Sequence, residues 1–289
     1  MLPAQKDIES VKNLITNVKN RKYLGYESNW LHEKIIEILG LSDEKTIQSL
    51  NNGKCKIYST EEEEQMLVYS FCRANHQINE ATNKIWATVE LAYSIKNSDT
   101  RLVKSFSHNY SLGTLIPSLY YSLLSAIVSN LCIYGIVSFR YNNQDLLLAR
   151  EVDSWKLFKR KKYLHDHFSN SSNSWHDQVQ IIYEGLLKEH YQVPNLDNVQ
   201  MKNLKDHRNK LHYIILSDIT MKDEFIGIKQ YFEFFPFCLI FIKDSLDLIQ
   251  SVWKITKKTD IRFQDLRKSL PKLYQLYRDE VPMPSDILI

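Results

Sequence analysis

Glycine and proline are scarce in this chain, with seven of each among its 289 residues. All-β folds and Rossmann-type folds use glycine in turns and phosphate-binding loops, so both fold classes are disfavoured. The sequence also lacks the motifs GxxxxGK(S/T), GxGxxG, HExxH and GxSxG. Their absence disfavours the common NTPases, dinucleotide-binding enzymes, zincins and α/β-hydrolases. Long segments with few turn-forming residues instead predict a mostly helical protein.

Cysteine is scarcer still, and its four copies are far apart, with no CxxC pair: Cys55, Cys72, Cys132 and Cys238. We therefore expect buried free thiols in a reducing compartment, rather than disulfide bonds or a thiolate zinc site. The opening residues, MLPAQKDIESVKNLI, lack an apolar stretch after a basic start, so no secretion signal is expected. These features predict a cytoplasmic protein. The net charge of +3 is compatible with a nucleic-acid partner without requiring one.

Charged residues are missing from a long stretch, residues 109–139, which includes LIPSLYYSLLSAIVSNLCIYGIVSF. The stretch is long enough to span a bilayer. Its serines, its tyrosines and Asn130 also suit a central helix that other helices surround. We prefer the buried helix, with a membrane-associated protein as the weaker alternative.

Helical periodicity is clearest after the segment STEEEEQMLVYS. Ser59 or Thr60, followed three residues later by Glu, forms a capping box, and it starts a helix that we expect to reach about Ile95. Seven apolar residues and one threonine then recur at alternating spacings of three and four: Phe71, Ala74, Ile78, Ala81, Ile85, Thr88, Ala92 and Ile95. This seam predicts packing along a roughly antiparallel neighbour, which we take to be the uncharged helix beginning near Pro117.

The remaining segments predict further helices and no strands. The first fifty residues suggest two or three short helices, and Asp197 or Asn198 can cap the helix that carries residues 205–215. Other helices are expected over 146–168, 175–190, a segment after Asp218 that kinks or restarts at Pro236, and 261–279. The predicted fold class is all-α, an up-and-down helical bundle with extra N- and C-terminal helices. The expected domains are an N-terminal helical extension (1–55), the bundle (56–258) and a C-terminal helix and tail (259–289).

Residues 205–215, KDHRNKLHYII, crowd basic groups onto one predicted helix. In helical projection, Leu204, Leu211 and Ile215 form a core stripe, with Arg208 at its margin. His212 follows Arg208 by one turn, so the two side chains are expected to be neighbours.

These residue types suit phosphodiester cleavage without a metal. A histidine with a pKa near 6.5 can take a proton from a ribose 2′-hydroxyl or give one to the leaving oxygen. The guanidinium of Arg208 can hold phosphate oxygens in a bidentate fork, and the amide of Asn209 can orient a partner. The predicted catalytic residues are therefore Arg208, Asn209 and His212. The cations expected to hold the RNA backbone are Lys202, Lys205, Lys159 and Arg160.

The run Arg208-Asn209-Lys210-Leu211-His212, on a late helix of an all-α bundle, resembles the HEPN superfamily. The family's signature is an Arg, usually followed by a polar residue, with His after a spacer of four to six residues. The spacer here is three residues long, and the resemblance covers about residues 60–256. A reserve pair with a four-residue spacer is Arg160 and His165.

The resemblance implies a four- or five-helix bundle that forms a homodimer, in which the two motifs meet across the interface. Many members are metal-independent ribonucleases of toxin–antitoxin, phage-exclusion and CRISPR systems. The implied function is thus a toxin or antiviral (abortive-infection) endoribonuclease that uses no cofactor and is restrained by an inhibitory antitoxin or a sensor protein. Other members have lost catalysis, so a non-catalytic helical RNA- or protein-binding module is the alternative.

Structural roles also fit the same residues. Arg208 could pair with Asp206 or another acidic neighbour, while His212 lines the edge of the core. The basic run WKLFKRKKYLHDHF (155–168) fits either a phosphate-binding surface or a solvated helix face. A metal site at His165-Asp166-His167 with His176 is the weakest alternative, because residues two apart on a helix diverge.

Overall fold

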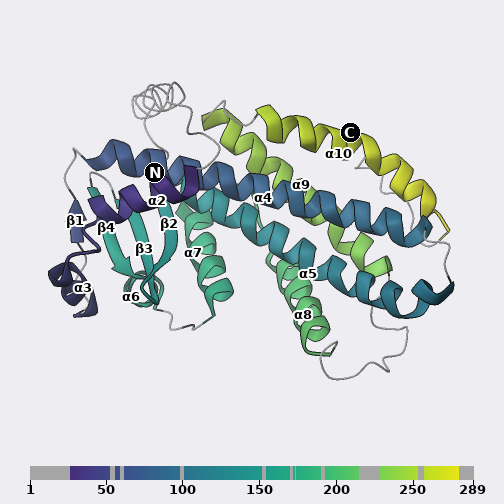
Figure 1. Cartoon of the computed structure of the whole chain (residues 1–289), viewed down its shortest axis with the longest axis horizontal. Helices are drawn as coiled ribbons and strands as arrows, with labels where there is room; N and C mark the ends of the chain where they lie inside the picture. Colours follow the sequence, from purple (N-terminus) through teal and green to yellow (C-terminus); the bar gives the residue numbers. More distant parts are fainter. Residues whose placement is uncertain are drawn as a thin grey trace. The chain divides into compact units, whose positions relative to one another are not determined.

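The computed structural model describes residues 27–52, 56–58, 62–97, 101–151, 154–169, 172, 174–189, 193–214, 228–252 and 257–279 (Figure 1). Most of these residues are helical, which confirms the prediction of a mostly helical protein, although the all-α class did not include the small sheet described below. The helices are α2 (Glu27–Ile38), α3 (Glu44–Asn51), α4 (Glu63–Asn97), α5 (Arg101–Ile133), α6 (Arg160–Phe168), α7 (Trp175–Glu189), α8 (Asn198–Ile214), α9 (Ile228–Val252) and α10 (Lys257–Leu276). The strands are β1 (Lys56–Tyr58), β2 (Ile136–Tyr141), β3 (Gln144–Glu151) and β4 (Ser154–Lys159).

Helix α4 buries the seam that its sequence predicts. All eight residues of the alternating pattern are less than a tenth exposed, from Phe71 to Ile95. Helix α5 is its antiparallel neighbour in this region: the Ser129 hydroxyl donates to the Ala74 carbonyl at 2.7 Å, and the Ser70 hydroxyl donates to the Cys132 carbonyl. The capping residues Ser59 and Thr60 lie outside the described residues.

The uncharged stretch does not form one helix. Helix α5 begins at Arg101, well before the expected start near Pro117, and it ends at Ile133. A turn with Gly135 at φ +76° then leads into β2. Within α5, Thr114–Ile133 is long and apolar enough to cross a membrane, yet most of this segment is buried inside the protein. This burial favours the core-helix interpretation.

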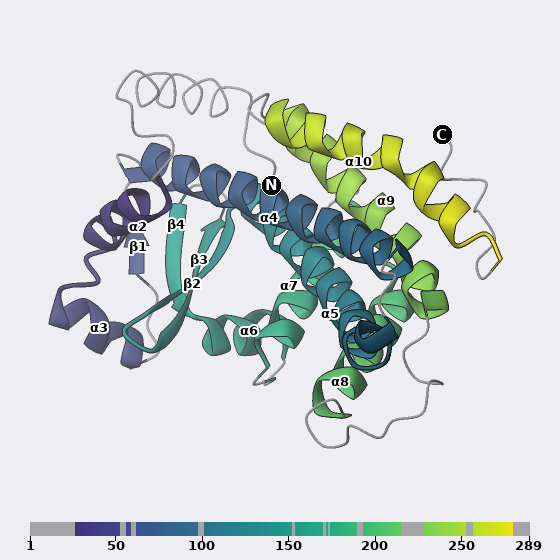
Figure 2. The same ribbon diagram turned by 45° about the vertical axis from the view of Figure 1, so that its right-hand side comes forward.

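A four-stranded antiparallel sheet, in the order β1-β4-β3-β2, was not expected from the sequence. Figure 2 shows β4, β3 and β2 side by side. Strands β2 and β3 form a hairpin through Asn142 and Asn143, both at positive φ, as a tight two-residue hairpin turn requires. The predicted helix over 146–168 is therefore wrong up to residue 159, and only Arg160–Phe168 is helical.

The physical reason for this error is the burial of β3. Leu146, Leu147 and Leu148 are all fully buried, so the strand reads as a continuous apolar run without the alternation that marks a half-buried strand. Of the two alternatives at Pro236, the restart is wrong, because α9 runs from Ile228 to Val252 with Pro236 inside it; the kink stays a prediction. Two of the short N-terminal helices are present as α2 and α3, while residues 1–26 lie outside the described part of the chain.

The described chain forms two compact units. Unit 1 comprises the described residues of Met1–Gln77, Ile127–Val193 and Leu248–Lys254, and it contains the sheet. Unit 2 comprises those of Ile78–Ala126, Pro194–Asp247 and Ile255–Ile289, and it contains α8 and α10. In unit 2, the Tyr277 hydroxyl donates to the Ala92 carbonyl at 2.7 Å, and the Tyr231 hydroxyl lies 3.0 Å from Thr88 Oγ1. These bonds fasten α9, and the turn that directly follows α10, to α4.

Candidate functional site

Helix α8 begins as its sequence predicts. The carboxylate of Asp197 accepts hydrogen bonds from the backbone amides of Val199 and Gln200, at 2.9 and 3.1 Å, and so caps the first turn. Leu204 and Leu211 are buried, which confirms them as part of the core stripe. This burial fixes the rotation of α8 about its axis and so determines where Arg208 projects.

Arg208 projects from α8 onto a tyrosine pair of α5, within unit 2. Its Nη1 donates to Asn209 Oδ1 at 2.7 Å, and its Nη2 donates to the Tyr121 hydroxyl. The guanidinium carbon also lies 5.3 Å from the ring centroid of Tyr120 and 5.1 Å from that of Tyr121. Hydrogen bonds in the guanidinium plane and aromatic rings near the group together hold it in one orientation.

The partners of Arg208 are electrically neutral. Among the residues that the structure describes, no carboxylate forms an ion pair with it, so the expected pairing with Asp206 is not seen. A guanidinium stays protonated at any physiological pH. Its positive charge is therefore held in place without being cancelled, which is the electrostatic condition for binding a phosphate group.

A second cation lies near the same tyrosine. Lys84 Nζ, from α4, is 5.9 Å from the ring centroid of Tyr121, 3.3 Å from Ser125 Oγ and 2.6 Å from a carboxylate oxygen of Glu80. Lys84 thus differs from Arg208 because a carboxylate balances its charge. Neither Lys84 nor the tyrosine pair was expected at the site. The adjacent tyrosines of the uncharged stretch were the available signal, but in the sequence they are indistinguishable from core residues.

The lysines and histidines of α8 differ in their surroundings, and of these Lys202, Lys205 and His212 were predicted at the site. Lys202 is exposed and Lys205 is partly exposed, as backbone-binding lysines would be. His207 lies against Phe234 of α9, with the ring centroids 5.4 Å apart. His212 is one helical turn past Arg208 in α8, but its side chain lies outside the described residues.

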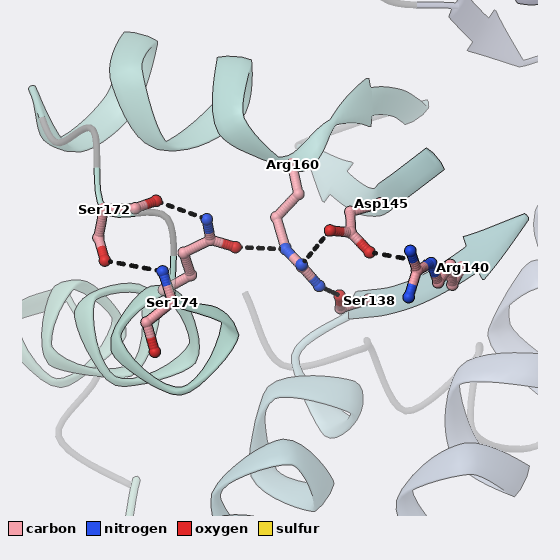
Figure 3. Close-up of polar contacts among 7 residues, drawn as sticks. Ser138, Arg140, Asp145, Arg160, Ser172 and Ser174 are labelled. Carbon is pink, nitrogen blue, oxygen red and sulfur yellow. Dashed lines mark hydrogen bonds and ion pairs between the residues drawn. The ribbon is translucent and has the colours of Figure 1, made fainter. Parts of the chain in front are cut away.

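Arg160 occupies a buried polar network of unit 1, drawn in Figure 3. Its Nε donates to Gln178 Oε1 at 2.5 Å, its Nη1 donates to Ser138 Oγ at 2.9 Å, and its Nη2 lies 2.9 Å from Asp145 Oδ2. Only 4% of the residue is exposed. Burial lowers the pKa of Arg160 from its ordinary value; Asp145 opposes that shift and Arg140 adds to it. All three guanidinium nitrogens are thus used inside the protein.

This environment does not fit the predicted role of Arg160 in holding RNA, and it does not support the reserve pair. His165 is exposed and lies 3.2 Å from Asp166. Positions five apart on α6 point about 140° away from each other. Lys159 ends β4 and is partly exposed, so the basic run is split between a strand and a helix and its cations do not share one helix face.

The histidines considered as metal ligands have other neighbours. His167 Nδ1 lies 2.9 Å from the Tyr163 carbonyl oxygen, and its ring stacks on that of Tyr163 at 4.1 Å. His176 lies against Trp175, with the ring centroids 5.3 Å apart. Within the described ranges, no group of three or more His, Cys, Asp or Glu side chains is placed to hold a metal.

A titratable histidine that the sequence did not single out lies in unit 1. His32 Nδ1, from α2, is 3.2 Å from the Tyr69 hydroxyl, and its ring meets that of Phe139 edge-on at 6.0 Å. Burial lowers the pKa of His32 below its usual 6.5; Arg73 adds to this shift and Glu33 opposes it. Burial also raises the pKa of Tyr69 to about 12, so its hydroxyl remains protonated.

We expect His32 to make the protein sensitive to acid. Because its folded-state pKa is depressed, the unfolded chain binds the proton more readily, so the stabilisation present above pH about 6.5 is lost as pH falls through the folded value. Melting temperatures measured from pH 7.5 to 5 should therefore fall less steeply for His32→Gln than for the wild type. His165→Gln, at an exposed histidine, should keep the wild-type slope. Equal slopes for all three proteins would contradict this.

Comparisons of the chain with protein families, with curated proteins and with solved structures found no match. Its own residues define a mostly helical protein with a small antiparallel sheet and, on α8, an arginine whose described partners are all neutral. A function is therefore inferred from this arginine and its neighbours.

Proposed function

We propose that this chain is a metal-independent endoribonuclease of the HEPN type whose motif is carried by α8. Arg208 binds and stabilises the scissile phosphate, His212 is the general acid or base, and Asn209 orients Arg208. The observation that carries the proposal is the 2.7 Å hydrogen bond from Arg208 to the Asn209 amide oxygen, in a setting where no described carboxylate neutralises the guanidinium. An arginine oriented by a neutral amide keeps its full charge for an anionic substrate.

The proposed reaction is attack by a ribose 2′-hydroxyl on the adjacent phosphorus. The bond from O2′ to phosphorus forms, the bond to the 5′ oxygen breaks, and the products are a 2′,3′-cyclic phosphate and a 5′-hydroxyl. A base removes the 2′ proton, and an acid protonates the leaving oxygen. In a homodimer whose two α8 motifs meet, the two copies of His212 supply both groups. Arg208 offsets the charge that builds on the phosphate oxygens.

The biological setting belongs to the same proposal. The resemblance of the α8 motif to the HEPN superfamily favours a cytoplasmic toxin or antiviral effector, with an antitoxin or a sensor protein that restrains it. The family's up-and-down bundle is the proposed finer description of the helices. The antiparallel run of α4 along α5 in unit 1 and the length of both helices support it.

The test is RNA cleavage by purified protein in the presence of EDTA. Wild type is expected to leave 2′,3′-cyclic phosphate ends, and His212→Ala should cut at least about 100-fold more slowly, because general acid–base catalysis contributes that much or more. The control is His165→Ala, at the exposed histidine of the reserve pair, which should cut at the wild-type rate. Equal cutting by wild type and His212→Ala would reject this site, and loss of cutting only in His165→Ala would move it to α6.

A second candidate is a non-catalytic helical module that binds RNA or protein. It is favoured by the contacts of Arg208, since both terminal nitrogens already have a protein partner and the bond to Tyr121 fastens α8 to α5. In this case the wild type leaves RNA intact under all conditions, and any binding survives His212→Ala unchanged.

A further inference from the structure

Tyr121 contacts the predicted catalytic arginine in two ways. Its hydroxyl accepts a hydrogen bond from Arg208 Nη2, and its ring centroid lies 5.1 Å from the guanidinium carbon. It reaches Arg208 from α5, 87 positions earlier in the chain. By contrast, Tyr120 is fully buried in the core, and only its ring faces the guanidinium, with the centroid 5.3 Å from the guanidinium carbon. Tyr121 is partly exposed, at the margin that a substrate could reach.

The position of Tyr121 is itself fixed from several sides. Its ring meets that of Tyr120 nearly edge-on, with centroids 5.5 Å apart and planes at 74°. Lys84 Nζ lies 5.9 Å from the same ring and is held by Glu80 and Ser125. Because the Tyr121 hydroxyl is held in place, its hydrogen bond restricts the orientation of the Arg208 guanidinium.

The two bonds leave most of the arginine's donors for another partner. A guanidinium carries five N–H groups. Asn209 and Tyr121 each accept from one of them, while Nε is buried and, in the described part of the chain, has no hydrogen-bond partner. These two bonds set the orientation of Arg208, and the second N–H of Nη1 and that of Nη2 remain for phosphate oxygens.

We propose that Tyr121 is a positioning residue of the ribonuclease site, which holds Arg208 in the orientation that meets the scissile phosphate. This inference rests on the proposed function. It predicts a loss in the chemical step rather than in RNA binding, because the phosphate charge is felt most strongly in the transition state. Removing one hydrogen bond to a charged group is expected to lower kcat roughly tenfold.

The test is Tyr121→Phe, which removes only the hydroxyl and keeps the ring. We expect kcat to fall roughly tenfold while KM stays within about twofold of wild type. The matched control is Tyr93→Phe, a hydroxyl deletion in the same unit at a residue 36% exposed on α4, which should leave both constants unchanged. A lower melting temperature with unchanged kcat would show a purely structural hydroxyl and overturn the inference.

A double-mutant cycle shows whether Tyr121 acts through Arg208. In an Arg208→Lys background, Tyr121→Phe should cost much less than in wild type, because the bond it supports is already lost. Full additivity would overturn the positioning role. If wild type leaves RNA intact, the ribonuclease itself fails, whereas an active wild type with an equally active Tyr121→Phe variant removes only this inference.

Discussion

Replacing Arg160 by Ala is expected to lower the free energy of unfolding by about 3 kcal/mol or more, and the melting temperature by roughly 10 °C. The substitution removes the central donor of the network in unit 1 and leaves Asp145, Gln178 and Ser138 without the partner they share. A buried polar group that loses its hydrogen-bond partner cannot recover its hydration, so its full desolvation free energy lowers the stability. Thermal and urea unfolding of the two proteins would measure the loss.

Arg140 provides the matched control for this prediction. Its guanidinium lies 3.9 Å from the same carboxylate of Asp145, but 68% of its side chain is exposed. Solvent screens such a pair, so Arg140→Ala should change the free energy of unfolding by about 0.5 kcal/mol or less. Similar losses in both variants would mean that burial does not set the strength of these interactions, contrary to the network in Figure 3.

The contrast between Arg160 and Arg208 shows what could be predicted from sequence. The seam of α4, the Asp197 cap and the core stripe of α8 depend on residues close together in the chain, and each could be found by periodicity or capping rules. The contact of Arg208 with Asn209 is equally local. These features define the helices and one side of the candidate site.

The features that were missed depend on distant partners. Arg160 looks like part of a basic surface until strands β2 and β3 bring Ser138 and Asp145 to it, from 22 and 15 positions earlier in the chain. In the sequence, Tyr121 is indistinguishable from a core residue, because its partner Arg208 lies 87 positions later and no neighbouring residue indicates the contact. Strand β3 was missed for a related reason: both of its faces are buried, so its sequence lacks the alternation of apolar and polar residues that indicates a strand.

The largest expected effect on activity is that of Arg208. Arg208→Ala should lower the rate of RNA cleavage at saturating RNA by about 1000-fold, the upper range for removing one preorganised donor group from a transition state. Arg208→Lys keeps the charge but cannot reproduce the planar fork that bonds Asn209 and Tyr121 together, so we expect a loss of about 100-fold. Initial rates with a defined RNA, in EDTA, would give both values.

The control must remove a positive charge from the same helix without touching this cluster. Lys210 is exposed on α8, so Lys210→Ala should cut RNA at close to the wild-type maximal rate. Its effect should be confined to a weaker dependence on salt if the lysine meets the RNA backbone. Because Arg208 also fastens α8 to α5, the melting temperature of each variant has to be measured beside its rate. A destabilised Arg208→Lys protein that still cuts at the wild-type rate would contradict the catalytic role. Arg208 would then only link α8 to α5 and would not bind the scissile phosphate.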